Sequence, residues 1–278
     1  MLKIRCQKVI IWFVCLFMYI SPSVSQEIIE VKGAIGESEI VGRISEVEAR
    51  QLAINNAKVE ALRKAGVGEY LKTYENLFRS ETNNDFSEFF SSDIHAELQG
   101  AIKEYQIVDE KRKVDQITNL FMYEVTLNAS VILYSSKPDP TFTVKVEGVK
   151  SVYEDGENFE FTIYSTKDCF LHIFGVADGY TAMLYPNSLE SQKPIKADKT
   201  VSFPLGYMEY PLFKTGDKPE VTRVIIVFTK EPIRFLKYKP MLVDGFEDWV
   251  TTSEDIFSWI YSITPDARMV EYQVFTVR

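Results

Sequence analysis

In residues 121–133 apolar side chains occupy every second position, and polar side chains such as Glu124 occupy many of the positions between them. Successive side chains of a strand point to opposite faces, so this alternation predicts a β-strand in a sheet with one buried and one solvated face. A second strand is predicted over residues 101–112, and the polar connection 115–119 would let the two strands pair. The sequence therefore predicts an antiparallel sheet in this part of the chain.

A helix is predicted over residues 45–65. Ser45 and Glu48 have the spacing of a capping box, and Gly66 supplies a natural stop. Alanine recurs every fourth residue, at positions 49, 53, 57, 61 and 65. Such a stripe of methyl groups lets a helix lie close on a sheet or on another helix.

Two neighbouring segments are less regular. Residues 28–31 predict a short strand, followed by a bend through Gly33 and Gly36. Residues 80–100 predict a short amphipathic helix, in which His95 is expected to be a surface or helix-cap group.

The segment 135–141 contains two prolines and no large apolar residue, so a domain boundary is predicted there. The fold class expected is α+β. Residues 26–136 would form a small domain with a helix on an antiparallel sheet, and residues 141–278 a mainly β domain.

The second domain is predicted to consist of short strands and one helix. Asp178-Gly179 between two apolar runs is a strong hairpin signal, and Pro186-Asn187 ends the strand that follows it. A helix is expected over residues 247–260. The strands are expected at residues 142–146, 159–163, 169–176, 181–185, 201–203, 221–228 and 269–277. Many short strands at this spacing indicate a β-sandwich with a helix near its C-terminal end.

The first 25 residues have the layout of a cleavable secretory signal. Lys3, Arg5 and Lys8 precede twelve apolar residues, and Ser23 and Ser25 are the small residues of a cleavage site before Gln26. An uncleaved anchor is the alternative, but twelve helical residues span about 18 Å, less than the ~30 Å of a bilayer core. We therefore expect an exported bacterial protein, periplasmic or envelope-associated, with no transmembrane span in the mature chain.

Reactive side chains are few. After cleavage Cys169 would be the one remaining cysteine, expected to be a small buried hydrophobic residue, and on a strand His172 would point to the opposite face. No catalytic, cofactor or metal-binding motif is found, and carboxylates such as Asp155, Glu157, Asp178, Asp244, Glu247 and Asp248 lie in turn-forming contexts. The net charge of −9 argues against a nucleic-acid partner.

Residues 159–187 resemble a bacterial family catalogued as domain of unknown function 4384. The resemblance rests on the apolar strand ending at Ser165, on Asp168-Cys169-Phe170-Leu171, on Asp178-Gly179, and on Leu184-Tyr185-Pro186-Asn187, with Phe203-Pro204 further on. It extends over roughly residues 141–278. It implies a β-sandwich appended to exported or multi-domain proteins, with no assigned activity.

The N-terminal half resembles a second group, the amino-terminal domain of flagellar assembly protein T and related small outer-membrane lipoproteins. The matching residues are Glu48-Ala49-Arg50, Ala53-Ile54, Ala57, Gly66, Ile107-Val108, Glu110 and the alternating residues 123–131. This resemblance implies a small α+β domain used in envelope assemblies. The chain lacks the lipid-anchor cysteine of the lipoprotein members.

Three functions are consistent with these features. The first is a non-enzymatic interaction or scaffold module whose partner is another envelope protein. The second is a glycan- or peptide-binding protein that uses exposed aromatic side chains or a sheet edge. The third, which has the least support, is a hydrolase built on two carboxylates. The sequence leaves the ligand-binding residues and the oligomeric state open.

Overall fold

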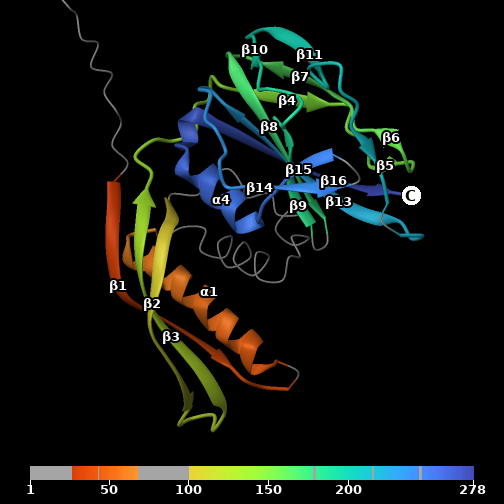
Figure 1. Cartoon of the computed structure of the whole chain (residues 1–278). Helices are drawn as coiled ribbons and strands as arrows, with labels where there is room; N and C mark the ends of the chain where they lie inside the picture. The colour runs from red at the N-terminus through yellow and green to blue at the C-terminus, as the bar shows by residue number, and fades with distance from the viewer. Residues whose placement is uncertain (1–26, 43, 68–99, 178–179, 215, 244–245) are drawn as a thin grey trace, which may run out of the picture.

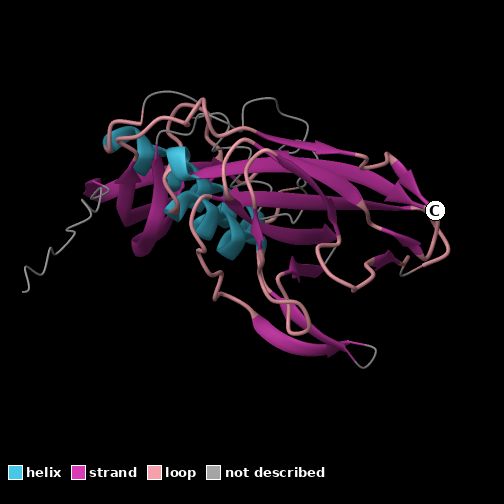
Figure 2. Cartoon of the chain, turned by 90° about the horizontal axis from the view of Figure 1, so that it is seen from above, coloured by secondary structure: helices cyan, strands magenta, loops and turns pink. Residues whose placement is uncertain are grey.

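The computed structural model describes residues 27–42, 44–67, 100–177, 180–214, 216–243 and 246–278. The chain forms an N-terminal lobe, described here by residues 27–133, and a C-terminal lobe, residues 144–278 (Figure 1). Strands make up most of both lobes, and the described helices lie toward one end of the molecule, away from the C-terminus (Figure 2). The fold is α+β, as the sequence predicts.

The N-terminal lobe is built on a three-stranded antiparallel sheet in the order β1-β3-β2. Its strands are β1 (Glu27–Glu39), β2 (Gly100–Val114) and β3 (Phe121–Leu133). The alternation in β3 is confirmed, because Val125, Leu127 and Val131 are fully buried on one face while Glu124 and Ser130 bind polar groups on the other. The strand predicted over residues 28–31 is longer in the structure, where β1 runs from Glu27 to Glu39. The expected bend is a β-bulge at residues 32–33, and the strand continues to Glu39.

Helix α1 (Glu46–Lys64) lies on the sheet through the predicted alanine stripe. Ala49, Ala53, Ala57 and Ala61 have no exposed surface. The helix begins where the Ser45 hydroxyl accepts a hydrogen bond from the backbone N–H of Glu48, and Gly66 follows its end with a positive φ. The helix lies so close to β1 that a Cβ atom on Gly36 would be 2.2 Å from the backbone oxygen of Ala53. Gly36, which the sequence predicts to lie in a bend, is therefore the residue at which β1 and α1 approach each other closely.

The C-terminal lobe has an eight-stranded sheet in the order β14-β15-β9-β8-β13-β16-β5, with β10 pairing to β8. A smaller sheet, β11-β7-β4, packs on one of its faces. The strands are β4 (Val144–Glu147), β5 (Val152–Tyr153), β6 (Glu157–Asn158), β7 (Phe161–Ser165), β8 (Cys169–Ala177), β9 (Tyr180–Tyr185), β10 (Pro194–Ile195), β11 (Lys199–Phe203), β12 (Pro211–Leu212), β13 (Glu220–Thr229), β14 (Lys239–Val243), β15 (Phe246–Val250) and β16 (Arg268–Val277). Strand β8 lies centrally, as its apolar residues on both faces predict.

Two hydrophobic clusters cover the two faces of the large sheet. Between the sheets, Leu171 and Ile226 pack with a group of aromatic rings that includes Phe161 and Phe203, whose centroids are 5.0 Å apart. On the other face, Phe174 and other residues of β8 and β13 pack against helix α4 (Ser253–Ser262). The sandwich is thus covered on its outer side by the C-terminal helix.

The helix predicted over residues 247–260 begins later than expected. Residues 246–250 form β15, which pairs with β14 and β9, and β14 was not predicted. Helix α4 begins at Ser253 because Thr252 is its N-cap and accepts a hydrogen bond from the backbone N–H of Asp255. A short 3-10 helix, η1 (Pro265–Ala267), leads from α4 into β16.

The two lobes share one hydrophobic cluster, which runs from α1 and the N-terminal sheet to α4. Tyr134, the residue directly after β3, donates a hydrogen bond to the backbone oxygen of Tyr261. The Arg268 guanidinium lies 5.3 Å from the Tyr134 ring and 5.0 Å from the Tyr261 ring. The guanidinium also donates to the backbone oxygen of Ile263, which supplies a hydrogen-bond partner for a carbonyl group at the end of α4. The same cation contacts both tyrosine rings and so links the two lobes.

Candidate interaction site

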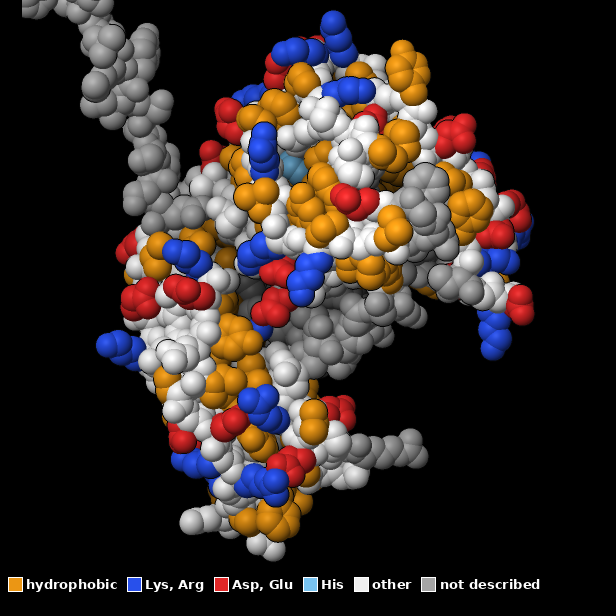
Figure 3. Space-filling view, in the orientation of Figure 1, with side chains coloured by type: hydrophobic (Ala, Val, Ile, Leu, Met, Phe, Trp, Pro, Cys, Tyr) orange, Lys and Arg blue, Asp and Glu red, His pale blue; other side chains and the backbone are white. Residues whose placement is uncertain are grey.

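The free end of the N-terminal lobe presents apolar side chains to solvent. Ile117, in the connection between β2 and β3, is 94% exposed, and Phe121 is 63% exposed. Val114 is also exposed, and Ile40 lies beside them at the end of β1. We call these four residues the apolar end. Figure 3 shows hydrophobic side chains gathered there, at the foot of the lobe.

Hydrogen bonds hold the β2–β3 connection in one shape. One Asp115 carboxylate oxygen accepts from the backbone N–H of Thr118 at 2.7 Å, from that of Ile117 at 2.9 Å and from the Thr118 hydroxyl at 3.0 Å. These bonds lower the pKa of Asp115. Asn119 takes a positive φ, and its N–H donates to the backbone oxygen of Asp115. These bonds fix the loop in a conformation in which Ile117 is exposed to solvent.

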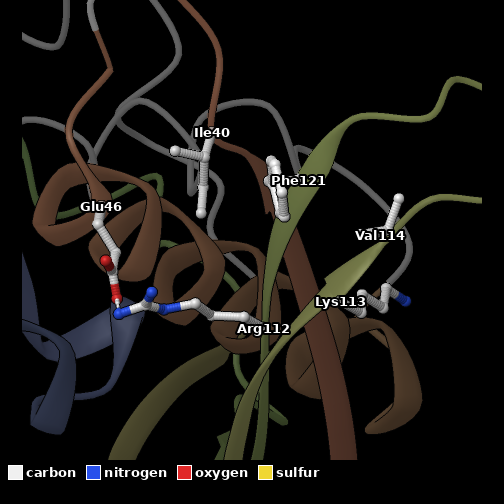
Figure 4. Close-up of a pocket in the computed structure, with 6 residues that line it drawn as sticks. All are labelled: Ile40, Glu46, Arg112, Lys113, Val114 and Phe121. Carbon is white, nitrogen blue, oxygen red and sulfur yellow. Dashed lines mark ion pairs between the residues drawn. The ribbon is translucent and has the colours of Figure 1, made fainter.

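A hollow of about 330 Å³ lies beside the apolar end. It is lined by Ile40, Glu46, Arg112, Lys113, Val114 and Phe121. In Figure 4 Ile40 and Phe121 lie on one side of it, while Arg112 and Glu46 face each other in an ion pair on the other. The hollow is thus an apolar surface bordered by a charge pair.

The other basic residues near this end are also paired. Lys113 Nζ lies 2.6 Å from a carboxylate oxygen of Glu37 and 2.7 Å from one of Glu124, and Lys111 Nζ lies 2.9 Å from Glu124. The two lysines lower the pKa of Glu124 to about 2. The three basic side chains near the apolar end, Lys111, Arg112 and Lys113, are therefore all neutralised by glutamates of the same lobe.

Several sequence predictions fall outside the described residues. These are the cleavage site Ser25-Gln26, the amphipathic helix with His95, the hairpin residues Asp178 and Gly179, and Asp244. Strands β8 and β9 pair antiparallel on either side of the hairpin residues, with Ala177 opposite Tyr180.

Strand β9 ends at Tyr185, and a loop that begins with Pro186 and Asn187 follows it. The Tyr185-Pro186 peptide bond is cis, and the Asn187 side-chain oxygen accepts from the backbone N–H groups of Leu189 and Glu190. Its amide also donates to the backbone oxygen of Leu184, so Asn187 holds the loop together.

Cys169 and His172 do not form a catalytic pair. Cys169 is fully buried between the two sheets, and burial raises the pKa of its thiol. His172 lies on the opposite face of β8, against Trp259 of α4, with the ring centroids 4.7 Å apart. Among the described residues, no cluster of His, Cys, Asp and Glu could hold a metal ion.

The described carboxylates that the sequence suggested for acid–base chemistry each bind a structural partner. Asp155 accepts from the backbone N–H of Lys214, and Glu157 forms an ion pair with Lys150. Glu247 accepts from the Trp249 indole, and Asp248 accepts from the Tyr180 hydroxyl. They do not converge on one hollow.

Sequence reasoning treated residues 115–119 as a polar connection and missed the apolar end. A signal was present, because Ile117 is an isolated large apolar residue between Gln116 and Thr118, close to Val114 and Phe121. A single exposed apolar residue is common, but three that lie close together at one end of a hairpin form a patch of the kind found at interaction sites.

A family model described as Domain of unknown function (DUF4384) matches residues 152–232, from β5 to just beyond β13. This supports the resemblance of the C-terminal half. No curated protein matches the chain. Among the described residues, no helix is long and apolar enough to cross a membrane.

Proposed function

We propose that this chain is an exported bacterial cell-envelope protein that acts as an interaction or scaffold module and has no catalytic activity. The observation that carries the proposal is the apolar end, where a hydrogen-bonded loop holds Ile117 in solvent beside Val114 and Phe121. Exposed apolar side chains gathered on a rigid element are typical of a protein–protein contact.

The partner proposed is another envelope protein with an apolar groove and a weakly charged rim. Arg112, Lys111 and Lys113 are paired with glutamates of the same lobe, so they leave little positive charge for an anionic lipid surface or a nucleic acid. The overall charge of −9 opposes both as well.

Export is proposed from the leader, residues 1–25, with cleavage between Ser25 and Gln26. Intact-mass measurement of the chain recovered from the envelope fraction of an expressing bacterium tests it. A mass that begins at Gln26 is expected. Recovery of the uncleaved chain in the cytoplasmic fraction would contradict the proposal.

The interaction is tested by photo-crosslinking in the native host. A photoreactive residue at position 117 is expected to give one reproducible protein adduct, and the same residue at the exposed position Lys145 of the other lobe is not. Equal yields of adduct at both positions, or no adduct at position 117, would contradict the proposal that the apolar end contacts the partner.

The purified partner then allows a matched comparison. Ile117→Asp is expected to weaken binding by about tenfold or more, because a buried unpaired charge would replace an apolar contact. Leu189→Asp makes the same change at an exposed apolar residue of the other lobe and is expected to leave binding unchanged.

A second candidate function is the binding of a glycan or peptide through aromatic side chains. A cavity in the C-terminal lobe that is lined in part by Phe170, Tyr238 and Trp249 supplies such aromatic side chains, and its few free polar groups favour the peptide over the glycan. A carboxylate hydrolase gains no support from either hollow, because neither is lined by two carboxylates. The N-terminal resemblance and the extension of the C-terminal resemblance to residue 278 stay predictions.

A further inference from the structure

The cavity of the C-terminal lobe has a volume of about 440 Å³. It lies between β8, the loop after β9, the segment 232–238 and β15. It opens on the face seen in Figure 3, where hydrophobic side chains surround the pale blue of a histidine. Because the family match ends at residue 232, much of the wall is supplied by the chain beyond the matched segment.

The floor of the cavity is apolar and uncharged. His172, Met183 and Phe235 are buried there, and Trp259 packs behind His172 and Phe235. His172 Nε2 lies 2.8 Å from the backbone oxygen of Ile233 and 2.9 Å from the side-chain amide nitrogen of Gln192. Burial lowers the pKa of His172 to about 4, which keeps the ring neutral near pH 7.

One wall is a flat aromatic surface. The rings of Tyr238 and Trp249 stack with centroids 4.2 Å apart and an interplanar angle of 10°. The Trp249 indole N–H is bound to Glu247, which fixes the ring. Leu236, 74% exposed, adds an aliphatic group at the edge. This wall suits a planar or aliphatic group better than a hydroxyl-rich one.

The polar groups of the lining are few and partly occupied. The Asn187 oxygen accepts two backbone N–H groups, and its amide donates to Leu184 and to the Tyr210 hydroxyl. Gln192 donates to the backbone oxygen of Leu171. A sugar, which needs many hydrogen-bond partners, would find few here.

Arg234 is the one charged residue among those that line the cavity. Within the described part of the chain its guanidinium has neither an ion pair nor a hydrogen bond, and no carboxylate lines the cavity. Glu190, in the loop after β9, accepts from the Tyr210 hydroxyl and forms an ion pair with Lys193. A guanidinium beside an apolar surface favours a planar anion, which it can bind with two parallel hydrogen bonds.

We propose that this cavity binds a carboxylic acid with an apolar body, the body lying on Tyr238 and Trp249 and the carboxylate on Arg234. The chemistry is shared by free aromatic or aliphatic acids and by the carboxy-terminal residue of a peptide. This site is separate from the apolar end and does not depend on the function proposed for it.

Tryptophan fluorescence provides the assay, because Trp249 lines the cavity and Trp259 packs against His172 behind it. The remaining tryptophan, Trp12, belongs to the predicted leader. The chain beginning at Gln26 is titrated with N-acetyl-L-phenylalanine, with its uncharged amide and with 3-phenylpropionate. Saturable quenching by an acid is expected, with the amide at least about tenfold weaker because it cannot form the charged pair.

The two acids distinguish the sources. If 3-phenylpropionate binds as tightly as N-acetyl-L-phenylalanine, the cavity recognises free acids. If N-acetyl-L-phenylalanine binds about tenfold more tightly, the cavity recognises the carboxy-terminal residue of a peptide. Both results support the proposal. Equal binding of the acid and its amide, or no saturation by either acid in the millimolar range, would overturn it.

Variants assign the effect to the site. Arg234→Gln is expected to abolish the preference for the acid over the amide, while Arg234→Lys keeps part of it. Lys239→Gln removes one positive charge at the start of β14, directly after this segment, and does not alter the lining, so this variant is expected to bind as the unaltered protein does. An unchanged preference in Arg234→Gln, or an equal loss in Lys239→Gln, would overturn the assignment.

Discussion

Replacing Gly36 by alanine tests how α1 is held on the N-terminal sheet. The added Cβ would lie 2.2 Å from the backbone oxygen of Ala53 and 2.2 Å from the backbone nitrogen of Ala57, more than 1 Å inside ordinary contact. Neither atom can turn away, because both belong to the helix backbone, and Gly36 itself is paired with Val125 of β3. The helix would have to move off the sheet by about 1 Å and lose close packing along the alanine stripe.

Overpacking a well-filled core costs about 1–3 kcal/mol, and a clash between two backbones lies at the upper end of that range. We therefore expect Gly36→Ala to lower the free energy of unfolding by about 3 kcal/mol. Urea unfolding followed by far-ultraviolet circular dichroism measures this, and amide hydrogen exchange should show the loss of protection in α1.

Gly33→Ala is the matched control. Gly33 lies in the same strand with a positive φ, and a Cβ there meets nothing within 4 Å, so the change costs about 1 kcal/mol for backbone strain alone. If Gly36→Ala destabilised the protein no more than Gly33→Ala does, the close approach of α1 to β1 would be refuted.

Three further outcomes follow from single side chains. Lys113 and Lys111 lower the pKa of Glu124 to about 2, so its stabilisation is complete above pH ~4.5 and disappears as the pH falls towards 2. Glu124→Gln should flatten the pH dependence of the unfolding free energy in that window, and an unchanged slope would contradict the ion pairs. Burial lowers the pKa of His172 to about 4, so its neutral form stabilises the fold above pH ~6.5, and this contribution is lost as the pH falls through 4. In His172→Gln the stability should vary less between pH 6.5 and 4. Cys169 should react with a thiol reagent only after unfolding, because it is buried; rapid reaction of the native protein would show that the sandwich opens.

Local sequence patterns determined much of the N-terminal lobe. The alternation of β3 and the alanine spacing of α1 each describe one element that buries one face, and both were predicted with nearly correct boundaries. Ser45 and Gly66 also behave as the predicted start and stop signals, because caps are decided by neighbouring residues.

The errors arise where distant residues decide the structure. Trp249 has the spacing of a helical apolar residue, but pairing with Met183 of β9 makes it part of a strand, and only Thr252 marks the true helix start. Likewise Gly36 was read as a bend, because the sequence does not show that a helix lies against it.

The two proposed sites were missed for a related reason. Ile117 is apolar in a segment whose other members suit a turn, and Arg234 meets Trp249 only after the chain has folded back through β14. A sequence pattern locates elements that bury their own faces, whereas a binding surface is made of residues left over after burial.

The position of β16 has a consequence for the order in which the molecule forms. Strand β13 pairs along its whole length with residues 268–277, so one of its edges has no neighbour until that distant stretch has left the ribosome. A chain still being synthesised would display an unsatisfied row of amide and carbonyl groups, a template for mispairing. The large sheet can therefore be completed only when the last strand of the chain is available to pair with β13.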